Sequence, residues 1–228
     1  MNRKILIIAA HPDDEILGCG GTMAVHSRTG DEVYVLILGE GVTSRDEKRD
    51  KEKRGKEINN LRMNIEAANR IVGTRKSFVF DFPDNRFDSV SLLDIIKVVE
   101  KVKNEVRPDI IYTHHRGDLN IDHQIAYRAV LTACRPLKGE TITDIYSFEV
   151  PSSTEWNVGF CSTFVPNYFV DISGSLEIKK KALRAYKSEV RSFPHPRSPE
   201  ALDIIAKRWG LQVGLEAAEA FEVIRSIR

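Results

Sequence analysis

Short apolar runs alternate with longer amphipathic stretches along this chain, and this alternation restricts its fold more than any other feature. The apolar runs are rich in β-branched residues, as buried strands are, and they cover residues 4–10, 32–38, 77–82, 109–113 and 145–150. The stretches predicted as helices are 15–29, 53–72, 91–106, 122–134, 175–191, 198–209 and 214–227, with Gly30, Gly73 and Pro108 as stops. Strands that alternate with helices predict an α/β fold, a three-layer sandwich with a mostly parallel sheet and right-handed crossovers.

Length and charge exclude several classes of protein. The chain has 228 residues, which suits a single domain over residues 1–228. Its 34 basic and 33 acidic residues leave a net charge of +1, which argues against a general nucleic-acid binder. The N-terminal apolar run is too short to span a membrane and lacks the features of a signal peptide. Cys19, Cys134 and Cys161 form no Cys-x-x-Cys pair, as expected for reduced thiols. We therefore expect a cytoplasmic protein with a small-molecule substrate and no nucleic-acid or membrane partner, with a homo-oligomer left open.

Ionisable side chains crowd the end of the first apolar run. His11-Pro12-Asp13-Asp14-Glu15 follows residues 4–10 directly. Ligands of parallel α/β sheets gather at the carboxyl ends of strands, and carboxylates at a buried strand end are costly unless a metal ion or another cation compensates them. The segment therefore predicts a metal site. Gly18, Gly20 and Gly21 lack the Gly-x-Gly-x-x-Gly spacing, so they predict close helix–strand packing rather than a dinucleotide site.

A second polar cluster follows the apolar run at 109–113. Residues 113–123 contain three histidines, and His123 begins the next predicted helix. Two imidazoles and one carboxylate would form an open catalytic site for Zn²⁺, with Fe²⁺, Co²⁺ or Ni²⁺ as alternatives. Each residue also has a structural alternative. A histidine can be a hydrogen-bonded strand-end residue, and Asp13, Asp14 or Asp122 can cap a helix.

Three motifs carry a resemblance to a known family: His11-Pro12-Asp13-Asp14-Glu15, Leu17-Gly18-Cys19-Gly20-Gly21 and Asp122-His123. They resemble the PIG-L/LmbE-like family of metal-dependent N-acetyl-sugar deacetylases, and the likeness extends over most of the chain. The resemblance implies a Rossmann-like α/β domain in which His11, Asp14 and His123 hold zinc. It also implies that Asp13 is the general base that activates water, and that the substrate is an N-acetylglucosamine-type amino sugar, whether free, glycosidic or nucleotide-linked.

The chain departs from the family pattern at Asn120, where several members carry a histidine three residues before the second ligand histidine. In those members this histidine stabilises the oxyanion or protonates the leaving amine. Asn120 is expected to donate a hydrogen bond to the oxyanion, but an amide cannot supply a proton. The acid is then Asp13, once it has taken the proton of water, or one of the candidates His114, His115 and His195.

His195 and Arg197 lie in the proline-framed segment Phe193-Pro194-His195-Pro196-Arg197-Ser198-Pro199. Prolines on both sides would hold an imidazole and a guanidinium in place with little loss of entropy on binding. We therefore predict that both side chains belong to the active site, His195 as a catalytic residue and Arg197 as a substrate contact. An ordinary turn is the alternative.

Five arginines are candidate substrate contacts, because guanidinium groups suit the phosphate oxygens of a nucleotide-linked sugar. They are Arg45, Arg62, Arg86, Arg116 and Arg197. Residues 81–88 follow the third strand, and they form either a sugar- or phosphate-binding loop or a self-bonded turn. The charge run 45–54 is a solvated segment or a flap over the substrate, and residues 151–166 are a candidate lid.

The predicted function is that of a zinc-dependent hydrolase that removes the acetyl group from an N-acetylated amino sugar. One alternative is a sugar- or nucleotide-binding module of the same fold without turnover. Another is an amidase that acts on a thiol conjugate or a different non-sugar amide. Asp13 beside the three ligands favours an enzyme, because a binding module needs no base there.

Overall fold

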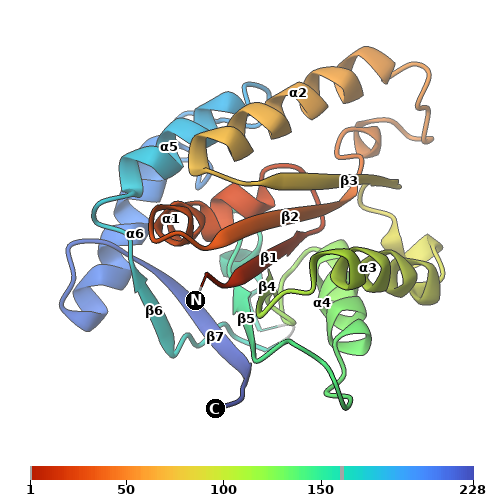
Figure 1. The fold of residues 1–228 in the computed structure, drawn as a ribbon. Helices are drawn as coiled ribbons and strands as arrows, with labels where there is room; N and C mark the ends of the chain where they lie inside the picture. The colour runs from red at the N-terminus through yellow and green to blue at the C-terminus, as the bar shows by residue number, and fades with distance from the viewer. Residues whose placement is uncertain (1, 160–161) are drawn as a thin grey trace.

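The computed structural model describes residues 2–159 and 162–228, which form three layers around a central sheet (Figure 1). The strands described run in the order β3-β2-β1-β4-β5-β7-β6. Their bounds are β1 Lys4–Ala9, β2 Glu32–Gly39, β3 Lys76–Phe82, β4 Ile110–His114, β5 Asp144–Phe148, β6 Tyr168–Asp171 and β7 Ala218–Ser226. Strands β1 to β5 are parallel, whereas β7 is antiparallel to both β5 and β6. The predicted α/β sandwich with a mostly parallel sheet is confirmed.

Helices cover both faces of the sheet (Figure 1). One face carries α1 (Asp14–Arg28), α2 (Gly55–Val72), α5 (Leu176–Ala185) and α6 (Pro199–Val213), and the other carries α3 (Leu92–Val106) and α4 (Ile121–Ala133). Short 3₁₀ turns follow β2, β3 and β5 at Thr43–Arg45, Phe87–Ser89 and Thr154–Trp156. Each turn leaves the carboxyl end of a parallel strand, the edge at which such sheets bind ligands.

Strand β1 is buried on both faces, which explains why its sequence is apolar without interruption. Ile5 and Ile7 pack in the core beneath α1, α2 and α5, whereas Leu6 and Ile8 pack in the core beneath α3 and α4. The strand lies between β2 and β4, where the strand order reverses. Because ligands bind at such a reversal, the residues that follow β1 and β4 are well placed for a site.

Gly18 and Gly21 let α1 approach its neighbours closely, as predicted. A β-carbon at Gly18 would overlap the ring of Phe148. We expect Gly18→Ala to lower the free energy of unfolding by about 1–3 kcal/mol, because overpacking outweighs the helical preference for alanine. Urea unfolding measures the change. The control is Gly55→Ala, whose β-carbon would meet nothing within 4 Å. A Gly18→Ala variant as stable as the wild type would contradict the prediction.

The predicted helix over residues 214–227 is wrong, because these residues contain β7. Helix α6 ends before Gly214, whose φ of 76° is left-handed. Alanine and glutamate favour a helix in isolation. Here, however, β7 pairs with β5 on one side and β6 on the other, and Ala218, Ala220 and Phe221 are buried. Tertiary pairing therefore outweighs local propensity in this segment.

Two further differences concern the same part of the fold. Strand β6 is absent from the sequence prediction, because its four residues are too few for a clear apolar pattern. The helix predicted over 175–191 ends at Ala185, and the following Tyr186 is fully buried in the core. Residues 187–198 therefore form a non-helical connection between α5 and α6, which contains the proline-framed segment 193–199 up to its last residue.

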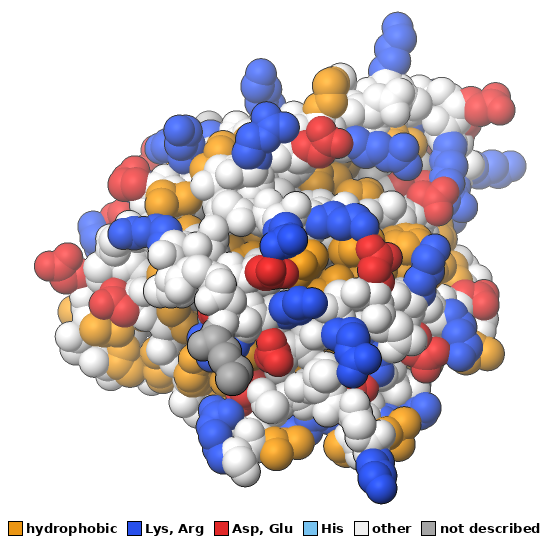
Figure 2. Space-filling model, in the orientation of Figure 1, with side chains coloured by type: hydrophobic (Ala, Val, Ile, Leu, Met, Phe, Trp, Pro, Cys, Tyr) orange, Lys and Arg blue, Asp and Glu red, His pale blue; other side chains and the backbone are white. Residues whose placement is uncertain are grey.

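The surface in Figure 2 carries acidic and basic side chains in alternation, in keeping with the net charge of +1. This face shows no extended basic patch of the kind that binds nucleic acid. Within residues 2–159 and 162–228, no helix combines the length and the apolar character that crossing a membrane requires.

Candidate metal centre and active site

The turn after β1 brings His11 and Asp14 to the carboxyl edge of the sheet. Asp13, which precedes α1, has a left-handed φ of 95°. This reversal lets Asp14 fold back, so that its Oδ2 accepts a hydrogen bond of 2.9 Å from the backbone N of His11. A left-handed aspartate at such a turn is strained and persists only when its surroundings hold it.

Glu15 supplies that support, a role for which the sequence offered no signal. Its Oε2 accepts a hydrogen bond of 3.1 Å from the backbone N of Asp13. Its Oε1 accepts from Asn69 Nδ2 at 3.0 Å and from the hydroxyl of Tyr186. Burial raises the pKa of Glu15 to about 7. The strained turn is therefore tied to α2 and to the segment after α5.

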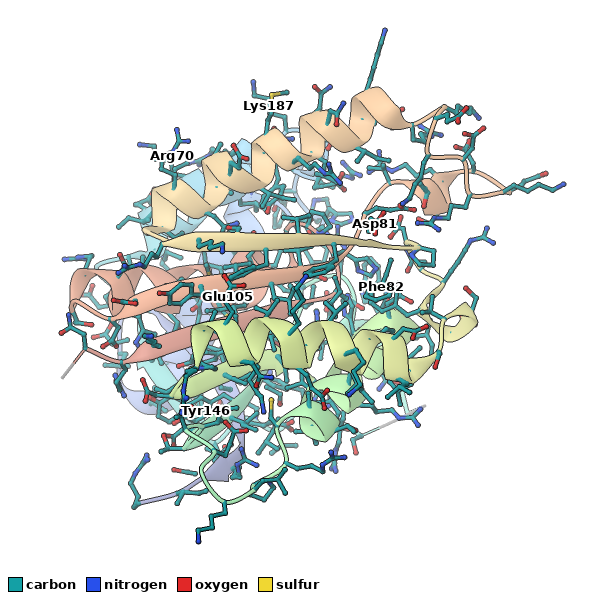
Figure 3. The ribbon with its side chains drawn as sticks, turned by 45° about the vertical axis from the view of Figure 1, so that its right-hand side comes forward. Arg70, Asp81, Phe82, Glu105, Tyr146 and Lys187 are labelled. Atoms are coloured by element: carbon teal, nitrogen blue, oxygen red, sulfur yellow. The ribbon has the colours of Figure 1, made fainter. Side chains whose placement is uncertain are left out.

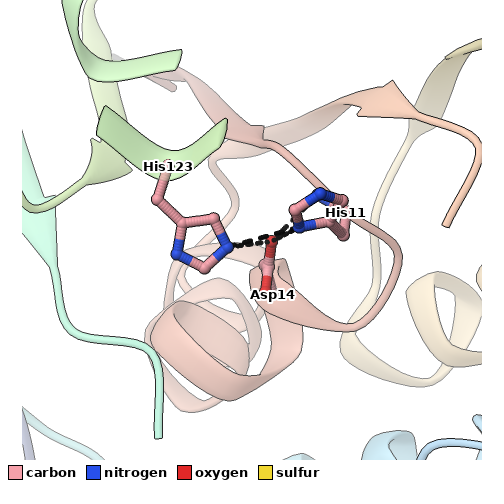
Figure 4. Close-up of side chains that lie close together, drawn as sticks. All are labelled: His11, Asp14 and His123. Atoms are coloured by element: carbon pink, nitrogen blue, oxygen red, sulfur yellow. Dashed lines mark hydrogen bonds and ion pairs between the residues drawn. The ribbon is translucent and has the colours of Figure 1, made fainter. Parts of the chain in front are cut away.

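His11, Asp14 and His123 converge on one point (Figure 4). His11 Nδ1 lies 3.4 Å from Asp14 Oδ2 and 3.3 Å from His123 Nε2. Asp14 Oδ2 and His123 Nε2 are 3.2 Å apart. Tetrahedral zinc with bonds of about 2.0–2.1 Å requires ligand atoms roughly 3.3–3.4 Å apart. The triangle therefore has the dimensions of three corners of such a tetrahedron. The side chain of His11 is 12% exposed and the other two are 1% exposed, so solvent reaches the centre beside His11.

Carboxylates behind both imidazoles fix their orientation. His11 Nε2 lies 2.9 Å from Asp122 Oδ2, and His123 Nδ1 lies 3.1 Å from Asp118 Oδ1. A carboxylate on one ring nitrogen holds the proton there and leaves the other nitrogen for a metal. Asp122 also accepts a hydrogen bond of 2.9 Å from the backbone N of Phe87. Asp122 thus orients His11 instead of capping α4, and Asp118, for which the sequence predicts no role, holds the equivalent position behind His123.

The centre concentrates negative charge. Four carboxylates surround the two imidazoles: Asp14, Asp84, Asp118 and Asp122. Burial lowers the pKa of His11, but Asp122 and Asp14 outweigh burial and raise it well above its usual value. Burial likewise opposes the carboxylates at His123, whose pKa is raised to about 9. A field that stabilises a cation on these rings also favours a divalent ion between them.

His114 and His115, two candidates for the acid, have other partners. His114 Nε2 accepts a hydrogen bond of 2.8 Å from the backbone N of Ala10, and burial lowers the pKa of His114 well below its usual value. His115 Nδ1 lies 2.7 Å from Glu222 Oε2, and its Nε2 donates to the carbonyl of Ser162 at 2.8 Å. Both rings connect segments, and His114 also packs against the centre: its Nε2 lies 3.6 Å from Asp14 Oδ2, and its ring stacks on that of His123 with 4.0 Å between centroids.

Asp13 lies beside the triad and is 1% exposed. Its Oδ2 accepts a hydrogen bond of 3.1 Å from Arg197 Nη1. Burial raises the pKa of Asp13 to about 8, and Arg197 acts in the opposite direction. The proline-framed segment thus reaches the first motif through Arg197.

His195 is one step further away. Its Nδ1 accepts a hydrogen bond of 3.1 Å from the backbone N of Arg197, and its ring meets Trp156 edge-on with 6.1 Å between centroids. Among the described residues, His195 has no hydrogen bond or ion pair to the triad or to Asp13. Its catalytic role stays a prediction.

Asn120 is the N-cap of α4. Its Oδ1 accepts a hydrogen bond of 2.8 Å from the backbone N of Asp122, and its Nδ2 donates to Asn85 Oδ1 at 2.8 Å. The amide thus fixes the start of the helix that carries His123. The oxyanion contact stays a prediction, and it requires Nδ2 to leave Asn85.

The other candidate arginines form no hydrogen bond or ion pair with the triad in the described part of the chain. Arg45 Nη2 bonds Glu189 Oε1 at 2.7 Å and lines a cavity of about 370 Å³, and Arg86 Nη2 donates to the carbonyl of Glu47 at 3.0 Å. Arg62 and Arg116 are exposed. Their roles as substrate contacts stay predictions.

The segments 45–54 and 81–88, at the carboxyl edge of the sheet, form hydrogen bonds and ion pairs with other residues of this chain. Figure 3 shows Asp81 and Phe82 at the end of β3, and the carbonyl of Asp81 accepts from Arg49 Nη2 at 2.7 Å. Within the charge run 45–54, Lys53 and Arg54 both form ion pairs with Asp46, so the run is held partly by its own residues. Residues 81–88 include Asp84, whose Oδ1 lies 3.4 Å from His11 Nε2.

The candidate lid also contacts the centre. Thr154 Oγ1 donates to Asp118 Oδ2 at 2.6 Å, and Ser153 Oγ donates to the other oxygen of the same carboxylate. Residues 160 and 161, which include Cys161, lie outside the described residues. The part of the lid that is described thus supports the carboxylate behind His123.

The chain is similar to several known proteins. A family model described as PIG-L, GlcNAc-PI de-N-acetylase, matches residues 6–134. The uncharacterized deacetylase YaiS of Escherichia coli (strain K12) is 30% identical over 192 residues, which cover 82% of this chain and 91% of the relative. The diacetylchitobiose deacetylase of Thermococcus kodakarensis is 28% identical over 231 residues, which cover 99% of this chain and 84% of the relative.

A solved structure with a different activity has the same fold. The 4-carboxy-2-hydroxymuconate hydratase GalB of Pseudomonas putida KT2440 superimposes with a TM-score of 0.76 at 22% identity, covering 99% of this chain and 98% of that chain. At this identity the likeness establishes the fold alone. One fold can host many reactions, so the chemistry depends on the residues of the site.

Proposed function

Because this chain belongs to the PIG-L family of GlcNAc-PI de-N-acetylases, we propose that it is a zinc-dependent hydrolase that removes the acetyl group from an N-acetylated amino sugar. The observation that carries the proposal is the triangle of His11 Nδ1, Asp14 Oδ2 and His123 Nε2, with Asp13 beside it. When bound there, a divalent ion would acidify a water molecule and polarise the acetamide carbonyl. Among the metals that this donor set suits, zinc is our choice.

Asp13 moves the proton in the proposed reaction. Arg197 Nη1 holds Asp13 Oδ2, so we assign the proton of the attacking water to Oδ1. Water oxygen then bonds to the acetyl carbon, the C–N bond breaks, and Asp13 returns the proton to the leaving nitrogen. His114 Nε2 accepts a hydrogen bond from the backbone N of Ala10, and His115 is bonded to Glu222 and Ser162, which favours Asp13 as the acid. The products are acetate and a free amine.

The substrate we propose is an N-acetylglucosamine-type sugar, free, glycosidic or nucleotide-linked. The similarity to a diacetylchitobiose deacetylase, which covers 99% of this chain and 84% of that relative, supports a sugar over a thiol conjugate. We place the reaction in the cytoplasm, which suits the free and buried Cys19 and Cys134.

The test is acetate release by the zinc-loaded protein from N-acetylglucosamine, diacetylchitobiose, UDP-N-acetylglucosamine and N-acetylcysteine. Acetate from one or more sugars, lost on chelation and restored by metal, supports the proposal. Acetate from N-acetylcysteine alone would favour the amidase alternative. Sugar binding without acetate, with each of Zn²⁺, Fe²⁺, Co²⁺ and Ni²⁺, would favour a binding module.

Asn120 allows two roles to be separated by two substitutions. Asn120→Asp keeps an oxygen for the N-cap and loses the amide donor, so a role at the oxyanion predicts a kcat lowered by about 10²–10³ with little change in KM. Asn120→Ala should show the same loss and, in addition, a free energy of unfolding lowered by about 1 kcal/mol. Steady-state kinetics and urea unfolding measure both. A normal kcat in Asn120→Asp would exclude the oxyanion contact and leave Asn120 only its role as the N-cap of α4.

A further inference from the structure

We propose that Arg197 is a positioning residue that holds Asp13 in its catalytic orientation, and that Glu189 in turn holds Arg197. The catalytic part of this proposal rests on the proposed function. The contacts of Arg197 are observed in the structure whether or not that function is correct. It assigns to Arg197 a role other than the substrate contact predicted from the sequence.

Arg197 uses two different nitrogens for two separate segments. Nη1 donates to Asp13 Oδ2 at 3.1 Å, and Nε donates to Ser152 Oγ at 2.8 Å. The guanidinium is planar and rigid, so two contacts fix its plane as well as its place. Because Asp13 is 1% exposed and the Arg197 side chain 26% exposed, water competes little with this pair.

The backbone around Arg197 is fixed on both sides. The backbone N of Arg197 donates to His195 Nδ1 at 3.1 Å. Ser198 is the N-cap of α6, with its side chain accepting from the backbone N of Ala201, and Pro199 follows in the first turn. The proline-framed segment thus gives the guanidinium a rigid base, which accounts for the His-Pro-Arg pattern without a substrate contact.

Glu189 extends the row of charges behind Arg197. Its Oε2 lies 4.0 Å from Arg197 Nη1, and its Oε1 accepts from Arg45 Nη2 at 2.7 Å. The Glu189 side chain is 9% exposed. Asp13, Arg197, Glu189 and Arg45 therefore alternate in sign. The guanidinium lies between two carboxylates, and turning it away would leave the buried Asp13 without this partner.

A positioning residue and a substrate contact make different kinetic predictions. Loss of a substrate contact raises KM, whereas a misplaced base lowers kcat and leaves KM nearly unchanged. The left-handed φ of Asp13 makes this residue especially dependent on its partners, because its backbone alone does not favour the observed turn.

The experiment compares Arg197→Ala and Arg197→Lys with Arg191→Ala in the zinc-loaded protein. Arg191 is a matched control, because it is exposed and, among the residues that the structure describes, its guanidinium donates only to the backbone carbonyls of Ser188 and Val190. We expect Arg197→Ala to lower kcat by about 10²-fold with KM and bound zinc unchanged, and Arg197→Lys to retain part of the rate. Added guanidinium chloride at millimolar concentration should restore part of the rate of Arg197→Ala and leave Arg191→Ala unaffected.

Other outcomes overturn the proposal. A raised KM with normal kcat would return Arg197 to the substrate. Wild-type kinetics in Arg197→Ala would leave Arg197 a structural residue. The same conclusion would follow if the variant kept its zinc, lost rate and were not rescued by guanidinium.

A second measurement is independent of activity. Urea midpoints of Asp13→Ala, Arg197→Ala and the double variant form a cycle in which each single substitution removes the contact. A non-additive shift is expected if the pair forms, and additive shifts would contradict it even if no acetamide is cleaved. A non-additive cycle in a protein that releases no acetate would contradict the proposed function and would still support the pairing of Arg197 with Asp13.

Discussion

Asp14→Ala is expected to lose bound zinc almost completely and to release no measurable acetate. Asp14 Oδ2 is the atom that both imidazoles of the triad face, at 3.4 Å from His11 Nδ1 and 3.2 Å from His123 Nε2. The same oxygen accepts the backbone N of His11, so its loss also frees the turn that aims this ring. With one ligand and one negative charge removed, zinc affinity should fall by more than about 100-fold, the upper end for loss of an outer partner.

Metal analysis after dialysis measures this directly. The wild type should hold about one ion per chain, and added zinc should raise its melting temperature but not that of Asp14→Ala. His11→Ala and His123→Ala should behave as Asp14→Ala does. Asp88→Ala, which changes an exposed aspartate at the same sheet edge, is the control and should keep its metal. Full occupancy in all three ligand variants would disprove the assigned centre.

Asp13→Asn should keep the metal and the fold while lowering kcat by about 10²–10⁴. An asparagine oxygen can still accept from Arg197 Nη1, so the turn keeps its partner at the position of Oδ2. The amide can neither take the proton from water nor return it to the leaving nitrogen, and these are the two steps that we assign to Asp13. The loss should therefore fall on kcat and leave the bound metal unchanged.

Kinetics and metal content measured on one preparation decide this prediction. The informative comparison is with Asp14→Ala, because the two aspartates are neighbours in the chain and differ in geometry. If Asp13→Asn lost zinc as Asp14→Ala does, the roles of the two aspartates would have to be exchanged. A kcat within a few-fold of the wild type would remove Asp13 from the proton transfer.

Local sequence was sufficient for the strands that form the centre of the fold and for the first motif. Runs such as residues 4–10 are apolar because β1 is buried on both faces, and a polar motif placed directly after such a run has to lie at the carboxyl edge of the sheet. His11 and Asp14 follow β1, and His123 follows β4, so the reversal of strand order between β1 and β4 brings them together. The order of strands and motifs along the chain is therefore enough to predict that two polar clusters share one edge of the sheet, whereas the choice of these three side chains came from the family resemblance.

The remaining features depended on tertiary structure, for physical reasons that differ from case to case. Residues 218–226 have a composition that suits a helix, and only pairing with strands on both sides makes them β7. Asp13 and Arg197 are 184 positions apart, and no local pattern encodes which buried carboxylate a distant guanidinium will reach. Periodicity and strand ends reflect burial and backbone direction, which each segment carries in its own sequence. Side-chain partners are selected by the packing of whole layers, so only the folded chain determines them.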